Sequence, residues 1–266
     1  MSELGLYLRY LAISLRSQMQ YRVSFLLQTT GHLLVTGIEF LGIWILFDRF
    51  DRLHDWTLPE VAVFYGFVNV AFSFADAFAR GFDLFGNTVR MGDFDRILLR
   101  PRSTVAQLAG QELTLKRVGR FIQGAIVLSW GVHTLGLPPT PERIALSLLV
   151  IGGTVALFIG LVIIQATIAF WTVETLEFMN SFTYGGVHAA QYPLSIYGPW
   201  LRRFFTLVVP LAATAYYPVV AFLGRTDPLH SPAWLPWISP LAGFAFLGLS
   251  LCLWGIGVRH YTSTGS

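Results

Sequence analysis

Three long apolar runs constrain this chain more than any other feature of its sequence. Ile144 to Trp171 and Ile238 to Val258 contain no charged residue, and Val23 to Phe47 contains a single carboxylate, Glu39. A helix needs about 20 apolar residues to cross a hydrocarbon core of roughly 30 Å, and each run meets that length. Only 12% of the residues are charged, well below the fraction usual in a soluble domain. The sequence therefore predicts an all-α integral membrane protein.

Weaker apolar runs bring the predicted number of spans to about six. The predicted spans cover residues 23–47, 61–80, 121–137, 144–171, 178–197 and 238–258. Before them, residues 3–22 repeat leucines at intervals of three and four, with Arg9 and Arg16 off that stripe. This pattern predicts an amphipathic helix in the membrane interface, or a cytosolic helix packed on a partner. Residues 1–266 are predicted to form one transmembrane domain.

The basic residues predict which side of the membrane each end faces. Loops that stay in the cytoplasm carry an excess of Lys and Arg. A cytoplasmic N-terminus places these residues inside twice as often as outside. Both termini are therefore predicted to be cytoplasmic, with residues 80–120 as the main cytoplasmic loop.

Residues 178–223 contain two moderately apolar runs, separated by Gly198 to Arg203. If both runs crossed the membrane, the C-terminal end would lie outside, against the charge rule. Pro210 and Pro218 each remove a backbone donor and disturb a helix. Broken backbone at membrane depth survives only where it is buried in protein or faces water. We therefore predict a fifth span followed by a re-entrant hairpin over 201–223, with two proline-kinked spans as the alternative.

The sequence contains no motif for catalysis or for binding a cofactor. The phosphate-binding pattern G-x-x-x-x-G-K-[ST] is absent and Lys116 is the single lysine, so this chain is not expected to hydrolyse ATP. The patterns H-E-x-x-H and G-x-S-x-G, and clusters of His and Cys at metal-ligand spacing, are also absent. We expect no enzyme activity, cofactor or metal on this chain. The arginines beside the predicted spans indicate membrane lipid and protein contacts, and not nucleic acid.

Ionisable side chains inside the predicted spans are few and are functional candidates by default. Glu39 lies deep in the first span and Asp76 lies near the inner end of the second. Asp76 could instead reach interfacial water or pair with Arg80 or Arg120. Glu39 could make a structural hydrogen bond between helices. Both carboxylates are candidate residues of a transport pathway.

Residues 83–103 carry the most informative local pattern in the chain. Its candidate docking residues are Gly92, Asp93, Phe94, Asp95, Arg96, Leu98 and Pro101. The two aspartates lie at the start of a predicted short helix, where they complement the helix dipole, and the proline ends that helix. Phe94, Ile97 and Leu98 can form one apolar face. An exposed apolar face in a cytoplasmic loop suits docking into a groove on another protein, with a helix lying on anionic lipid as the alternative.

Two motifs resemble those of a known family, the permease subunits of type-2 ATP-binding-cassette (ABC) exporters, and in particular a bacterial subgroup of them. Met91 to Pro101, with the sequence MGDFDRILLRP, is similar to that family's Gly-acidic-apolar-Asp-x-x-Leu-x-x-Pro loop. Tyr192 to Gly198, followed by Leu201 to Arg203 and Val209 to Pro218, is similar to the family's segment after the fifth span. The resemblance covers nearly the whole chain.

The resemblance implies a coupling helix at Gly92 to Pro101, seated on a separate cassette ATPase that carries ATP and magnesium. It also implies an outer re-entrant lid over 201–223, cytoplasmic termini, and a place in the inner (plasma) membrane. The lid residues would be Arg202, Arg203, Pro210, Tyr216, Tyr217 and Pro218. A second permease subunit, identical or a sibling, would complete the pathway.

The function that the resemblance implies is ATP-driven export. The predicted spans are rich in aromatic residues and poor in charge, which favours a hydrophobic or amphiphilic substrate. The alternative is a secondary transporter driven by an ion gradient through Glu39 or Asp76. That alternative predicts inverted repeats, and the two halves of the sequence show no convincing similarity.

Overall fold

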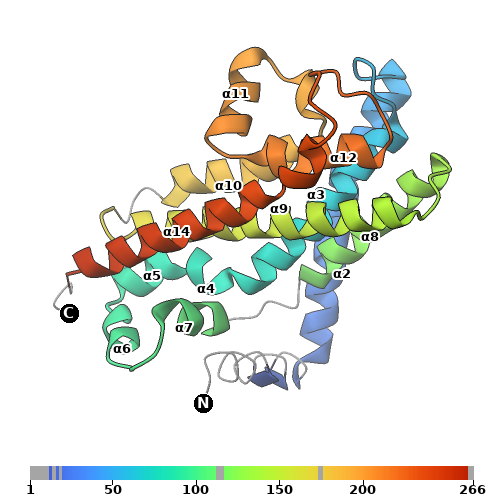
Figure 1. Ribbon diagram of the computed structural model, residues 1–266. Coiled ribbons are helices and arrows are strands. Elements are labelled where there is room, and N and C mark those ends of the chain that lie inside the picture. The colour runs from blue at the N-terminus through green and yellow to red at the C-terminus, as the bar shows by residue number, and fades with distance from the viewer. Residues whose placement is uncertain (1–11, 14–15, 18–19, 112–116, 173–175, 263–266) are drawn as a thin grey trace.

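The computed structural model describes residues 12–13, 16–17, 20–111, 117–172 and 176–262, with the backbone alone for 176–182. Most of the interfacial helix predicted over residues 3–22 falls outside these residues. Within the described part of the chain, long helices run side by side and short elements cover their two ends (Figure 1).

Six of the described helices run between the two ends of the molecule (Figure 1). They are α2 (Arg22–Phe50), α3 (Leu58–Phe78), α8 (Val118–Thr134), α9 (Pro141–Ile168), α10 (Leu176–Ala190) and α14 (Leu241–His260). Successive members of this set alternate in direction. The proximal end, as we call it, carries residues 80–111 and the C-terminal end of α14. The opposite, distal end carries the connections 51–57, 135–140 and 223–234.

Four stretches of the described chain are long and apolar enough to cross a membrane. They are α2, α3, α9 and Leu235–His260, which joins α13 (Leu235–Ile238) to α14. Helix α8 has 17 residues and α10 has 15. At 1.5 Å per residue they are about 26 and 23 Å long, short of a hydrocarbon core of about 30 Å. Four long candidate spans are therefore present, and six crossings stay a prediction.

The distal ends of α3 and α9 begin with capped turns. In α3, Glu60 Oε2 accepts hydrogen bonds from the Thr57 amide and from Thr57 Oγ1, both at 2.8 Å. In α9, Thr140 Oγ1 accepts from the Arg143 amide at 3.3 Å. Each helix also has a proline in its first turn, where a missing N–H breaks no helical hydrogen bond. These caps fix where the chain re-enters the bundle.

Helix α3 lies at the centre of the bundle, where residues 61–68 are all buried and the helix packs mainly against α8 and α9. Gly66 allows α8 to approach, because a Cβ at this position would overlap with Leu128. Helices α9 and α14 approach as closely at Gly243, where a Cβ would overlap with the Gly153 carbonyl. Small residues at such crossings are typical of helices that pack inside a membrane.

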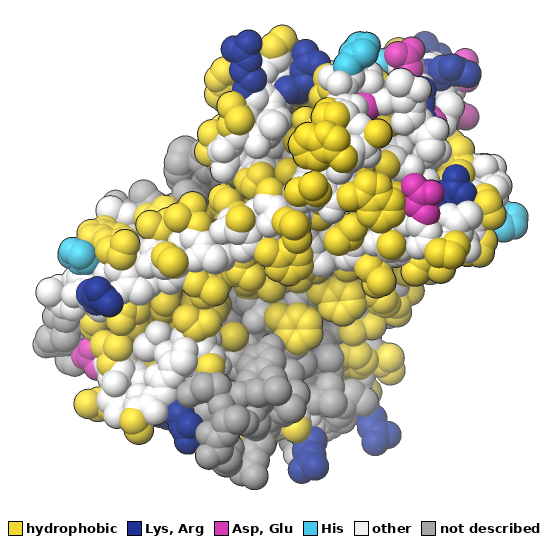
Figure 2. All heavy atoms as spheres, in the orientation of Figure 1, with side chains coloured by type: hydrophobic (Ala, Val, Ile, Leu, Met, Phe, Trp, Pro, Cys, Tyr) yellow, Lys and Arg dark blue, Asp and Glu magenta, His cyan; other side chains and the backbone are white. Residues whose placement is uncertain are grey.

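Figure 2 shows hydrophobic side chains spread over α14, α9 and α8, with most charged side chains gathered toward the edges of the molecule. Helix α2 buries only Thr36, Ile43 and Phe47 and leaves Ile38 and Ile45 exposed. A broad apolar surface between polar ends is expected of a protein surrounded by hydrocarbon. The chain is therefore a multi-pass membrane protein.

Short elements cover both ends of the bundle. At the proximal end these are α4 (Arg80–Asp83), α5 (Phe85–Arg90), α6 (Phe94–Leu98) and α7 (Thr104–Gln111). At the distal end they are the 3-10 turn η2 (Leu194–Ile196), α11 (Pro199–Leu207), the π-helical turn η3 (Ala212–Tyr216), α12 (Tyr217–Phe222) and α13. The axes of α11 and of the stretch Ala212–Phe222 are bent by 86°.

Pro210 lies at this bend, where the sequence predicts broken backbone. Helix α10 ends at Ala190, well before the span end predicted at residue 197. Pro193 explains the difference, because it lacks a backbone donor and disfavours helical geometry in the residue before it.

Candidate functional site

The proximal segment, Arg80–Gln111, folds back beneath the bundle as four short helices, α4 to α7 (Figure 1). Gly92 separates α5 from α6 with a φ of 72°, a conformation that side chains with a Cβ disfavour. Helix α6 begins directly after Asp93 and ends before Pro101. The sequence predicts a short helix at this place, and the additional helix α7 was not predicted.

Phe94 lies fully buried in a cluster of aromatic rings. Its ring centroid is 5.0 Å from those of Phe85 and Tyr261, 5.4 Å from that of Phe170 and 6.3 Å from that of Trp254. Inclined rings at these separations attract one another beyond the effect of burial. Because Phe170 follows α9 and Trp254 belongs to α14, the cluster joins the proximal segment to two long helices.

Hydrogen bonds hold the same segment in place. The side-chain amide of Gln107 donates to the carbonyls of Ile97 at 3.1 Å and Arg102 at 3.3 Å. Trp254 Nε1 donates to Thr104 Oγ1 at 3.1 Å. Gln107 and Thr104 were not predicted as site residues, because they follow Pro101 and lie outside the motif Met91 to Pro101. The one local indication of their role is a glutamine within a turn whose other side chains are apolar.

Two of the three residues predicted to form an exposed apolar face point inward. Phe94 is 0% exposed and Ile97 is 5% exposed, so the prediction is wrong for both. They are three residues apart, which places them on one side of a helix, and that side faces the aromatic cluster. The exposed apolar side chains of this region are instead Leu98, Met91 and Leu99, which is 85% exposed.

Basic side chains lie next to these exposed apolar residues in the sequence. Arg90, Arg96 and Arg100 are all exposed. Asp93 Oδ1 lies 3.2 Å from Arg96 Nη1, but this pair is open to solvent and contributes little to stability. We call the exposed apolar residues Met91, Leu98 and Leu99 the apolar tip of the proximal end.

Asp76 lies buried near the proximal end of α3, with its Oδ2 2.7 Å from Arg117 Nε. The sequence suggested Arg80 or Arg120 as partners. Arg80 instead pairs within α4, and the Arg120 guanidinium lies 5.1 Å from the centre of an aromatic ring of α3. Asp76 thus ties α3 to the start of α8. Removing one member of such a buried pair leaves an uncompensated charge.

Glu39 lies in the middle of α2, at a different depth from Asp76. Its Oε2 is buried and accepts no hydrogen bond within the described residues. Glu39 and Arg120 both act electrostatically on Tyr65, whose hydroxyl donates to the Thr36 carbonyl at 2.9 Å. Tyr65 and Asp76 are about 16 Å apart along α3. The structure therefore does not bring the two candidate pathway carboxylates together.

The predicted lid residues lie on both arms of the bent hairpin. On α11, Arg202 is half-buried and Arg203 is exposed; on the second arm, Tyr216 and Pro218 are buried and Tyr217 is half-buried. Pro218 lacks the N–H that would serve the Thr214 carbonyl in an α-helix. Thr154 Oγ1 of α9 donates to that carbonyl at 3.2 Å instead. A neighbouring helix thereby satisfies the broken backbone, as burial requires.

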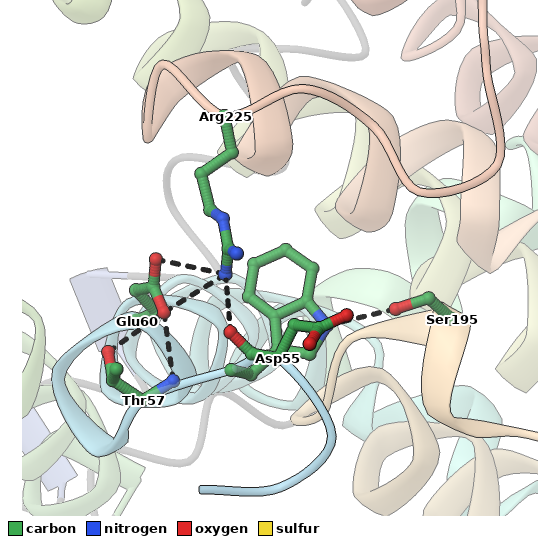
Figure 3. Close-up of polar contacts among 6 residues, drawn as sticks. Asp55, Thr57, Glu60, Ser195 and Arg225 are labelled. Carbon is green, nitrogen blue, oxygen red and sulfur yellow. Dashed lines mark hydrogen bonds and ion pairs between the residues drawn. The ribbon is translucent and has the colours of Figure 1, made fainter.

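A polar clasp fastens the loop after the hairpin to the distal end of α3 (Figure 3). Arg225 Nη1 lies 3.1 Å from both carboxylate oxygens of Glu60 and donates to the Asp55 carbonyl at 3.0 Å. Its guanidinium lies 4.4 Å from the centre of the Trp56 ring, a cation–π contact. Trp56 Nε1 in turn donates to Ser195 Oγ at 2.9 Å. We call these residues the distal clasp.

Two further contacts hold the hairpin at the same end. The Tyr216 hydroxyl donates to Asp227 Oδ1 at 2.7 Å, and Asp227 also accepts from the Leu229 amide at 2.9 Å. Arg143 Nε of α9 donates to the Phe222 carbonyl at 3.0 Å. The contacts at this end could not be predicted from the sequence, because most of their partners are far apart along the chain: Arg143 and Phe222 are 79 residues apart, and Glu60 and Arg225 are 165 residues apart.

The residues of both ends fall within one match to a known family. Residues 33–265 match the family described as "ABC-2 family transporter protein". The chain belongs to the ABC-2 transporter family. No curated protein and no solved structure matches the chain. The matched region of this ABC-2 permease runs from α2 to beyond α14 and includes the proximal segment, the bent hairpin and the distal clasp. An ABC-2 permease is the membrane subunit of a transporter, so the chain is a transport protein.

Proposed function

We propose that this ABC-2 permease is the membrane half of an ATP-driven exporter, and that its proximal segment docks on a separate cassette ATPase. The aromatic cluster around Phe94 is the observation that carries the proposal. It joins the exposed tip Met91, Leu98 and Leu99 to α9 and α14 through close-packed rings. Packed interiors transmit a displacement and absorb little of it. Movement of the docked tip would therefore tilt the long helices as rigid bodies.

In this proposal all six alternating helices cross the membrane, α8 and α10 being the short spans. The proximal end and both termini lie in the cytoplasm, in agreement with the exposed arginines that neighbour the tip in sequence. A second permease subunit, identical or a sibling, pairs with this one to enclose the pathway. ATP and magnesium bind to the ATPase subunits, and the protein lies in the inner (plasma) membrane.

The bent hairpin forms a re-entrant lid over the outer face in the same proposal. Its support is the 86° bend and the donation from Thr154 to the Thr214 carbonyl, because a broken helix at membrane depth needs such a partner. A hydrophobic or amphiphilic substrate fits helices so rich in aromatic residues and so poor in charge.

Reconstitution with a cassette ATPase that co-purifies with the permease tests the proposal. The pair in proteoliposomes should expel an amphiphilic fluorescent probe when ATP is supplied, and the permease alone should not. Transport by the permease alone on a proton or sodium gradient would contradict the proposal and indicate a secondary transporter.

Two variants separate docking from transmission in the same vesicles. Leu99→Asp places a charge on the exposed tip and should weaken ATPase binding. Phe94→Leu loosens the ring cluster and leaves the tip in place, so it should retain the ATPase but lose part of the transport per ATP hydrolysed. If both variants transport the probe and bind the ATPase as well as the unmodified permease does, the role proposed for the proximal segment is wrong.

A further inference from the structure

A cavity of about 470 Å³ opens at the distal end, between α3, α8, α9 and α12. Its floor is apolar and includes Phe67 and Phe222, whose ring centroids are 5.1 Å apart, together with Leu128. Its polar groups include the side chains of His133 and Arg143, near the connection between α8 and α9. None of these residues belongs to the proximal segment or to the distal clasp.

The polar and apolar groups of the cavity lie at different depths. His133 is in the last turn of α8, and Leu128 lies five residues earlier, about 8 Å toward the middle of the bundle. Phe67 is nine residues into α3, about 14 Å from the start of that helix. The cavity therefore has a polar, basic mouth at the level of a membrane interface and an apolar interior at the level of the hydrocarbon.

Arg143 is held at the mouth by the protein backbone. Its Nε donates to the Phe222 carbonyl at 3.0 Å and its Nη1 to the Pro138 carbonyl at 3.2 Å. Within the described residues its Nη2 donates no hydrogen bond. A guanidinium fixed in this way keeps one edge for an anionic ligand. Glu142 is adjacent in sequence, but it is exposed and does not line the cavity.

We propose that this cavity binds an anionic phospholipid from the membrane leaflet on the distal side. The phosphate would lie against Arg143 and His133, and one acyl chain would lie on Phe67, Leu128 and Phe222. At about 30 Å³ for a group the size of a water molecule, 470 Å³ holds about 16 such groups, roughly the number of carbon atoms in one acyl chain. The site does not depend on ATPase binding, so it can be tested apart from transport.

Native mass spectrometry of the purified permease tests the headgroup contact. The detergent-solubilised protein is titrated with phosphatidylglycerol and with phosphatidylcholine of the same acyl chains. Both lipids carry the phosphate, but the choline cation of phosphatidylcholine is repelled by the Arg143 guanidinium, so the unmodified protein should prefer phosphatidylglycerol by about tenfold. Arg143→Gln should lose that preference and still bind phosphatidylcholine. An unchanged preference in Arg143→Gln would overturn the assignment of the phosphate.

A second variant keeps the test valid if Arg143→Gln fails to fold. Ser129→Phe fills the cavity from an exposed position on α8 and removes no observed hydrogen bond. It should lose tight binding of both lipids. Thr134→Phe, also exposed on α8 but outside the cavity, is the matched control and should bind as the unmodified protein does. Equal lipid binding by Ser129→Phe and Thr134→Phe would show that the lipid does not occupy this cavity.

Discussion

The two ends of this permease are held together by different kinds of interaction. At the proximal end, the buried rings of Phe85, Phe94 and Trp254 pack with half-buried Phe170 into one cluster. At the distal end, the second arm of the hairpin is packed in the main core, with Phe222 on Phe67, but the loop that follows it is fastened by the hydrogen bonds and the one ion pair of the distal clasp. A close-packed cluster resists movement in every direction, whereas a few polar contacts can break together. The comparison indicates that the proximal segment and the second arm of the hairpin move with the long helices, and that the loop after the hairpin can open by itself.

Phe94→Ala should have the largest effect on stability. It removes a fully buried ring from the centre of the cluster, and such truncations cost about 3–5 kcal/mol. The measurement is the free energy of unfolding in mild detergent. Leu99→Ala, a truncation at an exposed site five residues away, is the control and should change it by less than about 0.5 kcal/mol. Equal effects of the two would contradict the packing described for the proximal end.

Gly81→Ala should have the next largest effect on stability. A Cβ at Gly81 would overlap with the Leu108 carbonyl, so α4 and α7 would be forced apart. Overpacking of this kind costs about 1–3 kcal/mol. Gly42→Ala on α2 meets no atom within 4 Å and serves as the control in the same unfolding experiment. A stable Gly81→Ala variant would show that α4 and α7 are not rigidly packed.

Arg225→Gln should have a smaller and more local effect. It breaks the ion pair with Glu60 and the contact with Trp56, and we expect a loss of about 1–2 kcal/mol. Hydrogen exchange should become faster in residues 217–225 and stay unchanged in residues 80–111. Arg225→Lys keeps the charge and loses the planar stacking, so its stability and its exchange rates should lie between those of the unmodified protein and of Arg225→Gln. Faster exchange at both ends would contradict the independence of the distal clasp.

Leu99→Ser should have the smallest effect on unfolding, within about 0.5 kcal/mol, because the side chain is exposed. Its affinity for the cassette ATPase should nevertheless fall by about tenfold, because the variant buries less apolar surface when the ATPase binds. A tenfold change corresponds to about 1.4 kcal/mol of binding free energy. Surface plasmon resonance with the purified ATPase measures the change. Leu207→Ser, on the exposed face of α11, should bind as the unmodified permease does.

The long helices could be predicted from the sequence because their cause is local. Uninterrupted apolar runs specify α2, α9 and α14, and the structure places each within a few residues of the predicted bounds. The break at Pro210 was predictable for the same reason, since proline acts on its own helix. The direction in which the Phe94 side chain points was not predictable, because it depends on packing against Phe170 and Trp254, which are distant in sequence.

The distal clasp and the Asp76–Arg117 pair show why the long-range side-chain contacts could not be predicted from the sequence. Arg80 and Arg120 were as plausible as partners of Asp76 as Arg117, and only the packing of α8 against α3 decides among them. Arg225 stands alone in a polar loop, with no local feature that points to Glu60. Long-range pairs of this kind follow from the fold, and a single sequence does not contain them.

Site-directed cross-linking tests most directly the claim that the proximal segment docks on an ATPase. The single cysteine, Cys252, is exposed and can be replaced by serine to give a cysteine-free permease. Leu99→Cys and Leu207→Cys, at positions 85% and 79% exposed, then place one thiol at each end of the molecule. With a thiol-to-amine cross-linker and the cassette ATPase, we predict a cross-linked product from Leu99→Cys and none from Leu207→Cys. A product from Leu207→Cys with none from Leu99→Cys would contradict the account.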